Sequence, residues 1–309
     1  RESIYEFRKA IDLRPSSSDY HFHLGINYGS LDYPHFFYWK IIQNSFERTM
    51  MLDPTDVRHL YFIGMYYLNE YQKLKHMGWS IEKKGPANKE NYLAISKDNY
   101  QLYFRKLVDV NEEYLGKILN ACFSVTQDYV DLRSLIGDTA RSHFTFARFL
   151  DGKGMWEEAE REYREAINLE PANPIYYSRF AHALSRRRYY EDAIYWWQKQ
   201  KLIDPGDGKP YLFSADSFIK LKRFDDAVRE LRELIKLDPE NINYHIRLVK
   251  TLLDARRLDE AIDEYRKVMG KTKSFSESLY EKIRQYQRKG DYPKAVRMLN
   301  EALASAVNR

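Results

Sequence analysis

Eight histidines and one cysteine are the residues of this 309-residue chain whose types could support metal or nucleophile chemistry. A metal site needs several ligands on one face of an element, but His21 and His23 are two residues apart and point to different faces of a helix. Cys122 has no second cysteine with which to form a disulfide or a thiolate metal cluster. We therefore expect no metal site in this chain.

Motifs for phosphate binding and for acyl transfer are also missing from the sequence. The glycines of 152–154 and 206–208 fall in predicted turns and do not form a loop that holds phosphate. No Gly-x-Ser-x-Gly motif or Cys/His pair indicates a nucleophile. The acidic residues of 157–162 are interpreted as the solvated face of a helix. We therefore expect no catalytic residues, no cofactor and no enzymatic activity.

The element that must position every residue of this chain is a repeat. Alanines recur at intervals of 34 residues, at Ala159, Ala193, Ala227, Ala261 and Ala295. A fixed period of this size predicts a solenoid, in which one supersecondary unit recurs and each copy packs on its neighbours. Such an array offers a long surface for partners and no single deep catalytic pocket.

Each repeat is predicted to be a pair of amphipathic helices. Large apolar residues stand three before and four after each alanine, as Trp156 and Tyr163 do around Ala159, so that they share one helix face. Twelve residues after each of the first three alanines comes a proline, such as Pro171, which ends this second helix because it has no amide hydrogen. A second apolar stripe upstream, which includes Ala147, predicts the first helix.

This pattern resembles the tetratricopeptide repeat (TPR) family, which has small residues at positions 8 and 27, alanine at 20, an aromatic residue at 24 and proline at 32. The best-matching residues of 140–173 are Ala147, Ala159, Tyr163, Ala166 and Pro171. Gln200 and Leu234 replace the small residue at position 27 in the next two repeats. The resemblance implies an all-α fold, an α-α superhelix (a TPR solenoid) of antiparallel helix pairs.

Two regions of different regularity are predicted within one continuous solenoid. Residues 138–309 are interpreted as five regular units of 34 residues, and residues 1–137 as irregular TPR-like repeats with insertions. Within the irregular region we predict a helix over 91–110, shorter helices over 113–123 and 128–136, and a loop over 83–88. His21, His143 and His245 all occupy position 4 of their repeats, where we expect a partly buried histidine bonded to a backbone carbonyl.

Charge and hydropathy exclude two classes of partner. The net charge is +5, from 50 basic and 45 acidic residues spread along mixed-sign faces, and this is not the clustered basic stripe of a nucleic-acid-binding protein. The densest run, 186–188, is interpreted as a solvated turn. No apolar stretch reaches the 18–20 residues that a membrane span needs. Because the sequence begins at Arg1, inside what we interpret as half of a helix pair, we expect it to be part of a longer protein.

The family resemblance also implies where a partner would bind, since the first helix of each pair lines the concave groove. At positions 5 and 9 the candidate residues are Phe22, Tyr61, Phe144, Arg148, His182, Asp216, Lys250, Tyr280 and Arg284. Aromatic and arginine side chains favour binding, and this mixture suits a peptide or helix with apolar anchors and some acidic groups. Position-5 side chains can equally pack on the next helix. The function predicted is a non-catalytic protein–protein interaction scaffold. The lysine and asparagine of chaperone-tail clamps are absent, so that ligand is disfavoured.

A second resemblance concerns residues 114–171, which are similar to the soluble TPR tails of bacterial O-antigen ligase or polymerase-like membrane proteins. It implies an alternative function, as an extracytoplasmic accessory domain in envelope polysaccharide assembly. The location would be periplasmic in that case, and it is otherwise open between cytoplasm and periplasm.

The N-terminal edge is the last predicted feature. Ile4, Phe7 and Ile11 form an apolar stripe on a helix whose partner would lie upstream. Terminal repeats need a polar outer face to stay soluble. We therefore expect this stripe to be uncovered and to permit a homo-oligomer.

Overall fold

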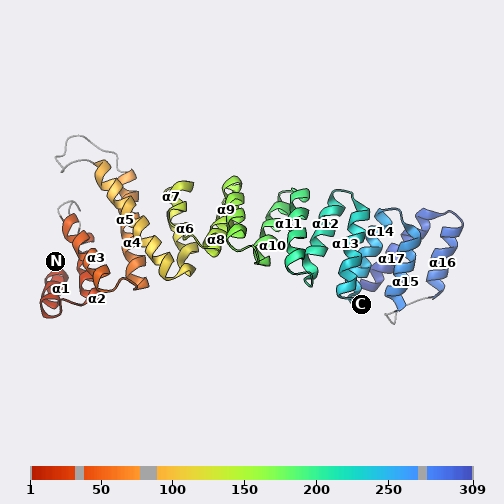
Figure 1. Ribbon diagram of the computed structural model, residues 1–309, viewed down its shortest axis with the longest axis horizontal. Coiled ribbons are helices and arrows are strands. Elements are labelled where there is room, and N and C mark those ends of the chain that lie inside the picture. The colour runs from red at the N-terminus through yellow and green to blue at the C-terminus, as the bar shows by residue number, and fades with distance from the viewer. Residues whose placement is uncertain (1, 32–37, 77–88, 271–276, 308–309) are drawn as a thin grey trace. The chain divides into compact units, whose positions relative to one another are not determined.

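The computed structural model describes residues 2–31, 38–76, 89–270 and 277–307 (Figure 1). All regular elements of these residues are helices, which confirms the predicted all-α class. The chain divides into two compact units, 1–169 and 170–309. The predicted loop over 83–88 lies outside the described residues. The predicted boundary at 137/138 between irregular and regular repeats, and the continuity of the solenoid, stay predictions.

The described residues of the first unit form ten helical segments. They are α1 (Glu2–Leu13), α2 (Ser18–Gly29), α3 (Trp39–Leu52), α4 (Val57–His76), α5 (Lys89–Val110), the 3-10 turn η2 (Glu112–Tyr114), α6 (Leu115–Phe123), α7 (Tyr129–Arg133), α8 (Ala140–Gly152) and α9 (Trp156–Leu169). The helices α2 and α3, α4 and α5, and α8 and α9 pack as pairs. The helices predicted over 91–110, 113–123 and 128–136 correspond to α5, to η2 with α6, and to α7.

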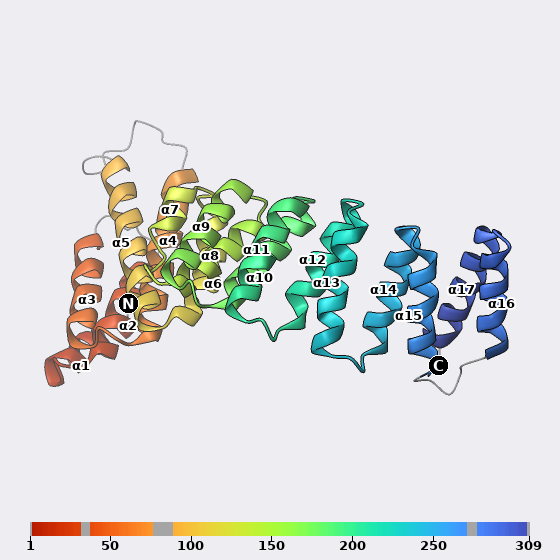
Figure 2. The same ribbon diagram turned by 45° about the vertical axis from the view of Figure 1, so that its right-hand side comes forward.

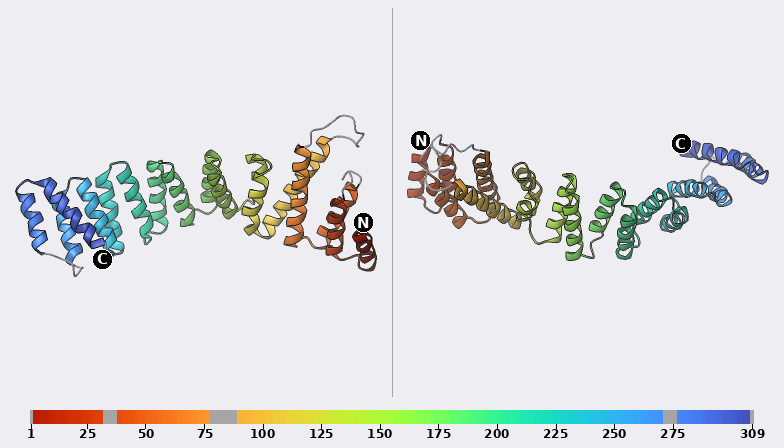
Figure 3. Two further views of the ribbon diagram at one scale, coloured as in Figure 1. Left: turned by 180° about the vertical axis from the view of Figure 1, so that it is seen from behind. Right: turned by 90° about the horizontal axis from the view of Figure 1, so that it is seen from above.

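The second unit is a stack of regular helix pairs (Figure 2). Its helices are α10 (Pro174–Arg186), α11 (Tyr190–Ile203), α12 (Gly208–Lys220), α13 (Phe224–Leu237), α14 (Ile242–Asp254), α15 (Leu258–Gly270), α16 (Glu277–Arg288) and α17 (Tyr292–Val307). Within each pair the two helices pack on each other, and α11 and α13 also pack on the first helix of the next pair. Figure 3 shows the pairs of each unit from two further sides.

The 34-residue alanines lie at the helix contacts, as the repeat predicts. Ala159, Ala193, Ala227, Ala261 and Ala295 are all 0% exposed. The apolar residues four positions later, such as Trp197 and Leu231, are also fully buried. Small side chains at these points let two backbones approach, and the larger neighbours fill the space beside them.

Both ends of the regular helices follow local sequence signals. In the second unit, Asn173, Asp207 and Asn241 cap α10, α12 and α14, and each side chain accepts a hydrogen bond from the backbone N–H two residues later. The helices α9, α11 and α13 each end two residues before the predicted proline.

The turn inside each pair uses left-handed backbone. Positive φ values recur at intervals of 34 residues, at Gly154, Arg188, Lys222, Arg256 and Gly290. Glycine adopts this conformation at little cost, whereas a residue with a Cβ atom is strained there. The three middle repeats nevertheless carry exposed cations at this position, and the described part of the chain offers them no ion pair.

Position 4 of several repeats is tied to the preceding turn. His21 Nε2 lies 3.1 Å from the Pro15 carbonyl oxygen, and His245 Nε2 lies 3.0 Å from that of Pro239. This confirms the expected bond to a backbone carbonyl. His143 differs, because its Nδ1 lies 2.6 Å from Glu162 Oε2 in a buried pair. His245 makes a second contact of the same kind, with Glu264.

The N-terminal stripe is partly covered, whereas we expected it to be uncovered. The helix α1 packs on α2, so that Ile4 is buried and Phe7 and Ile11 are half-buried. The Phe7 ring stacks on His23 at a centroid distance of 5.2 Å. The homo-oligomer expected at this edge stays a prediction.

Candidate binding groove

The predicted groove residues of the second unit lie on the first helices of successive pairs. His182 is on α10, Asp216 on α12, Lys250 on α14, and Tyr280 and Arg284 on α16. Lys250 is exposed, Tyr280 is buried, and the others are half-buried. The helix face chosen from the repeat register therefore runs along consecutive pairs of this unit.

Two of the charged groove residues in the C-terminal part of this face, Asp216 and Arg284, are already paired within the protein. Asp216 forms an ion pair with Arg247 of the next pair. Arg284 pairs with Asp259 and Asp263, and its Nε donates to the Tyr280 hydroxyl. These side chains hold neighbouring repeats together, so less of their charge is available to a partner.

The predicted groove residues of the first unit are mainly aromatic. Phe22 is 9% exposed, and its ring centroid lies 4.6 Å from that of His59, so most of this side chain is used in packing. Tyr61 and Phe144 are half-buried. Arg148 is exposed and lies over the Phe144 ring at 5.8 Å.

A pocket of about 450 Å³ opens on the groove face at the start of the second unit. We call it the α10–α12 pocket, since most of its wall comes from these two first helices. It is lined by Pro174, Ile175, Ser178, Arg179, His182, Gln200, Asp207, Lys209 and Phe213. Of the residues predicted for the groove, it contains His182.

Aromatic rings form one wall of the α10–α12 pocket. The His182 ring lies edge-on to Phe213 at 4.3 Å and to the buried Trp197 at 4.7 Å, and the Trp197 and Phe213 rings stack at 5.2 Å. Burial lowers the pKa of His182, and the positive charges of Arg179 and Arg186 lower it further. The imidazole is therefore neutral at neutral pH, and this wall is apolar in character.

Two cations that line this pocket lack an internal ion-pair partner. Arg179 on α10 and Lys209 on α12 are both exposed and line the pocket. Neither forms an ion pair with any carboxylate in the described part of the chain. The pocket therefore presents uncompensated positive charge beside aromatic surface.

Gln200 supplies a buried polar group at the edge of the pocket. Its side chain is 3% exposed, and its Nε2 donates to Asp207 Oδ2 at 3.0 Å. Asp207 Oδ1 in turn accepts the Lys209 amide as the cap of α12. Gln200 Oε1 is buried and has no hydrogen-bond partner among the described residues. Most buried polar atoms in proteins are paired, so an unpaired carbonyl oxygen points to a missing partner.

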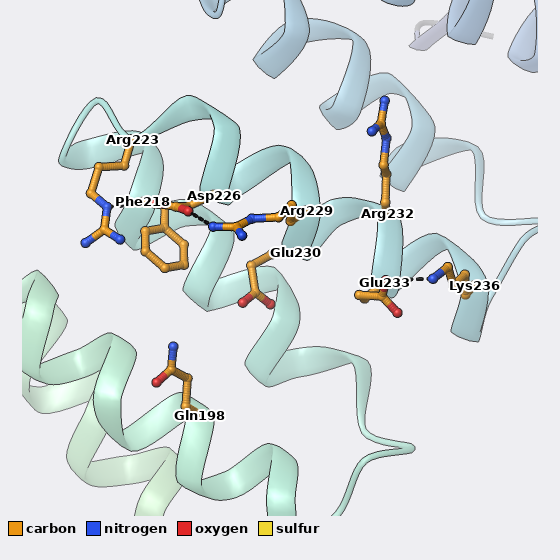
Figure 4. Close-up of a pocket in the computed structure, with 9 residues that line it drawn as sticks. All are labelled: Gln198, Phe218, Arg223, Asp226, Arg229, Glu230, Arg232, Glu233 and Lys236. Atoms are coloured by element: carbon orange, nitrogen blue, oxygen red, sulfur yellow. Dashed lines mark hydrogen bonds and ion pairs between the residues drawn. The ribbon is translucent and has the colours of Figure 1, made fainter.

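A second pocket lies on the second helices and differs in charge (Figure 4). It is lined mostly by charged residues of α13, and these are paired with each other or with neighbours. Arg229 bonds Asp226, Lys236 bonds Glu233 at 2.7 Å, and Glu230 bonds Lys201. With its charges satisfied internally, this pocket is a weaker candidate for a ligand than the α10–α12 pocket.

The described residues contain no group of three or more His, Cys, Asp or Glu side chains that could hold a metal ion. Nor does any described helix have the length and apolar character needed to cross a membrane.

Comparison with known proteins agrees with the repeat. Residues 218–274 match the family model of a tetratricopeptide repeat. These residues are therefore identified as tetratricopeptide repeat sequence. The match spans α13, α14 and α15, and the buried alanines extend the same register to α9, α11 and α17. The search of curated proteins found no match.

Solved structures show more distant likeness. A MamA protein is 20% identical over 55% of this chain and 92% of its own, with a TM-score of 0.43. YrrB, titled a TPR protein with an unusual peptide-binding site, is 17% identical over 61% of this chain and 92% of its own, with a TM-score of 0.42. MamA from Desulfovibrio magneticus RS-1 is 16% identical over 58% and 96%, with a TM-score of 0.39. The similarity of residues 114–171 to envelope-polymerase tails stays a prediction from sequence.

Sequence reasoning missed most of the residues that line the α10–α12 pocket. Lys209 lies at position 2 of its repeat, a groove position of the family from which we selected no residue, and Arg179 lies at position 6, directly after position 5. Gln200 was visible as a departure from the family pattern at position 27. What the sequence could not show is which cations find an internal partner, since Arg247 and Arg284 do and Arg179 and Lys209 do not.

Proposed function

We propose that this chain is a non-catalytic scaffold that binds a peptide or a partner helix on the first-helix face of its second unit, with the α10–α12 pocket as the main contact. TPR folds serve protein–protein interaction, and that coarser assignment follows from the family match and from the helix pairs. The observation that carries the finer proposal is the pocket itself, where an aromatic wall and two unpaired cations lie together on the groove face.

The aromatic wall favours a peptide over a small polar ligand. Phe213 and Ile175 offer apolar surface, and Ile175 is 56% exposed. An apolar side chain of a partner that covers this surface would remove it from water, which is the main source of affinity at such contacts. The pocket is open along the groove and suits one or two side chains of an extended or helical segment.

The test is a screen of the whole chain against a synthetic library of dodecapeptides, followed by mapping of each binder. We expect binders with Kd in the micromolar range, equivalent to about −8 kcal/mol. Their binding should protect backbone amides of α10 and α12 from hydrogen exchange. The variant Phe213→Glu should abolish binding, whereas Arg229→Glu in the second pocket should not. A library without binders, or binders that protect only second helices, would refute the proposal.

A further inference from the structure

We infer that an apolar pocket between the last two helix pairs binds a small amphiphile, a molecule with an apolar body and one anionic group. The pocket has a volume of about 350 Å³ and is lined by Leu253, Arg256, Leu258, Tyr292 and Val296. We call it the α14–α17 pocket, since these residues lie on α14, in the turn after it, and on the first turns of α15 and α17. It shares no lining residue with the α10–α12 pocket, so this ligand goes beyond the proposed function.

The α14–α17 pocket opens where the preceding repeats of this unit are closed. The residues that correspond to Val296 in the two preceding repeats are Ile262 and Val228, which are 0% and 1% exposed, whereas Val296 is half-buried. The residue that corresponds to Tyr292 is Leu258, which is 8% exposed, whereas Tyr292 is 57% exposed. The last repeat therefore leaves accessible an apolar surface that the same positions bury in the preceding repeats.

The wall of the α14–α17 pocket is mainly aliphatic. Leu253 and Val296 are half-buried, and Leu258 is buried. A ligand with an apolar body would cover these side chains and remove their surface from water, which is the main favourable term in such binding. The volume of about 350 Å³ suits a small molecule, because it lies at the low end of the range of ligand sites, which is about 300–1,000 Å³.

Arg256 determines the charge of the ligand, because it is the one charged residue that lines this pocket. Other exposed cations of the unit, such as Lys222, also lack an ion pair among the described residues, and what distinguishes Arg256 is its place beside an apolar pocket that no acidic residue lines. The adjacent Arg257 is already held by Asp225 and Glu260. The Arg256 guanidinium is therefore the group that can donate two hydrogen bonds to an anionic group of a ligand whose body fills the pocket.

The ligand class is tested with octanoate, octylammonium and acetate, each titrated into the full chain below micelle-forming concentrations and followed by methyl NMR. We expect octanoate to shift the methyl signals of Leu253, Leu258 and Val296. It should bind about fivefold more tightly than octylammonium at low salt, and this difference should fall as salt rises. Acetate, which has the anionic group without the apolar body, should leave the three signals unchanged. Equal affinity for octanoate and octylammonium, or no shift with octanoate, would contradict the inference.

The role of the cation is tested with Arg256→Gln, which should remove most of the difference between octanoate and octylammonium. The matched control is Lys222→Gln, which changes the cation at the same position one repeat earlier, where Leu258 and Ile262 are buried. This control should keep the preference for octanoate. A preference that survives in Arg256→Gln, or that is lost equally in both variants, would show that Arg256 does not select the ligand.

The position of the ligand is tested by filling the pocket with Val296→Phe. We expect this variant to fold, because the pocket offers room for the larger side chain, and to lose octanoate binding. Octanoate should raise the melting temperature of the parent chain and leave that of the variant unchanged. If Val296→Phe fails to fold, Leu253→Phe fills the pocket from α14. A folded variant of either kind that binds octanoate like the parent would refute the α14–α17 pocket as the site.

A last variant separates this site from the α10–α12 pocket. Phe213→Glu changes the aromatic wall of the α10–α12 pocket and should bind octanoate with the affinity of the parent chain. Loss of octanoate binding in Phe213→Glu, with binding retained in Val296→Phe, would assign the amphiphile to the α10–α12 pocket and overturn the inference.

Discussion

At two positions of the first unit, glycine is required because an aromatic ring of the paired helix packs against it. Gly64 on α4 lies under the ring of the fully buried Phe104 on α5, and Gly25 lies in the same way under Phe46. Glycine is needed at these points because the ring occupies the space of a side chain. The small residue of the TPR pattern at position 8 has here become the smallest one.

Gly64→Ala is therefore expected to destabilise the chain. A Cβ atom at this position would lie 2.4 Å from Phe104 Cε1, and the buried ring has little room to move. Overpacking of this kind costs about 1–3 kcal/mol. The measurement is the free energy of unfolding in urea. Gly116→Ala on α6 is the control, since nothing lies within 4 Å of its Cβ position and alanine favours the helix; equal effects of the two changes would contradict this packing argument.

The buried Glu162 makes stability depend on pH. Burial alone would raise the pKa of its carboxyl, but hydrogen bonds from His143 and Tyr129 and the nearby charges of His143 and Arg133 outweigh it and hold the pKa below its usual value. The folded chain therefore binds this proton less readily than the unfolded chain. The resulting stability is fully present above the unfolded pKa of about 4.3 and is lost as pH falls through the folded value.

We expect Glu162→Gln to flatten this acid limb. The free energy of unfolding, measured from pH 7 down to pH 3, should fall less steeply below about pH 5 than in the parent chain. At pH 7 the variant should be less stable by about 3 kcal/mol, since one partner of a buried pair is removed. Glu165→Gln on the same helix is exposed and serves as the control. An unchanged acid limb would show that this carboxyl is not responsible.

At the scale of residues, the sequence predicts which apolar side chains are buried far better than it predicts which polar side chains pair with each other. The apolar positions follow from the period alone. The pairing of His143 with Glu162 needs two side chains 19 residues apart to meet across a helix pair. Histidine recurs at position 4, and the same 19-residue spacing joins His245 to Glu264. We assigned only a backbone partner to these histidines, so the glutamates were missed.

At the scale of elements, the contacts between packed helices contribute much of the free energy of unfolding. Ala193→Leu on α11 would add a branched side chain at a site that is 0% exposed. We expect a loss of about 1–3 kcal/mol in the free energy of unfolding, seen as a lower melting temperature. Ala172→Leu, in the exposed turn before α10, should leave melting nearly unchanged. If both variants melt like the parent, the repeat register is wrong.

Helix positions could be predicted from the sequence because the helix-ending prolines and the 34-residue apolar period indicate the same boundaries. The helix predicted over 91–110 is observed over Lys89–Val110, and the second helices end where the prolines require. The partial cover of the N-terminal stripe was not predicted, because we considered helices only in complete pairs. Helix α1 finds enough apolar surface on α2 to cover most of its stripe.

At the scale of the whole molecule, the second compact unit has an apolar core of its own. The apolar cluster that includes Ala227, Leu252 and Ala295 is built from residues of the second unit only. We therefore expect residues 170–309, expressed alone, to stay helical by circular dichroism and to unfold in a cooperative transition. A broad, non-cooperative melt of this fragment would show that its core depends on the first unit. Residues 1–169 provide the reciprocal measurement.

The left-handed turns of the second unit also affect how copies of the chain meet in solution. Arg188, Lys222 and Arg256 project from equivalent turns, one per repeat, at positions where glycine would cost the backbone less. The periodic surfaces of two copies of the chain can align repeat against repeat, so two copies could associate side by side. Cations of like sign at three successive turns make that alignment repulsive. Placing a cation instead of glycine at these turns costs backbone strain. The repulsion between these charges disfavours side-by-side association of two chains and favours colloidal stability.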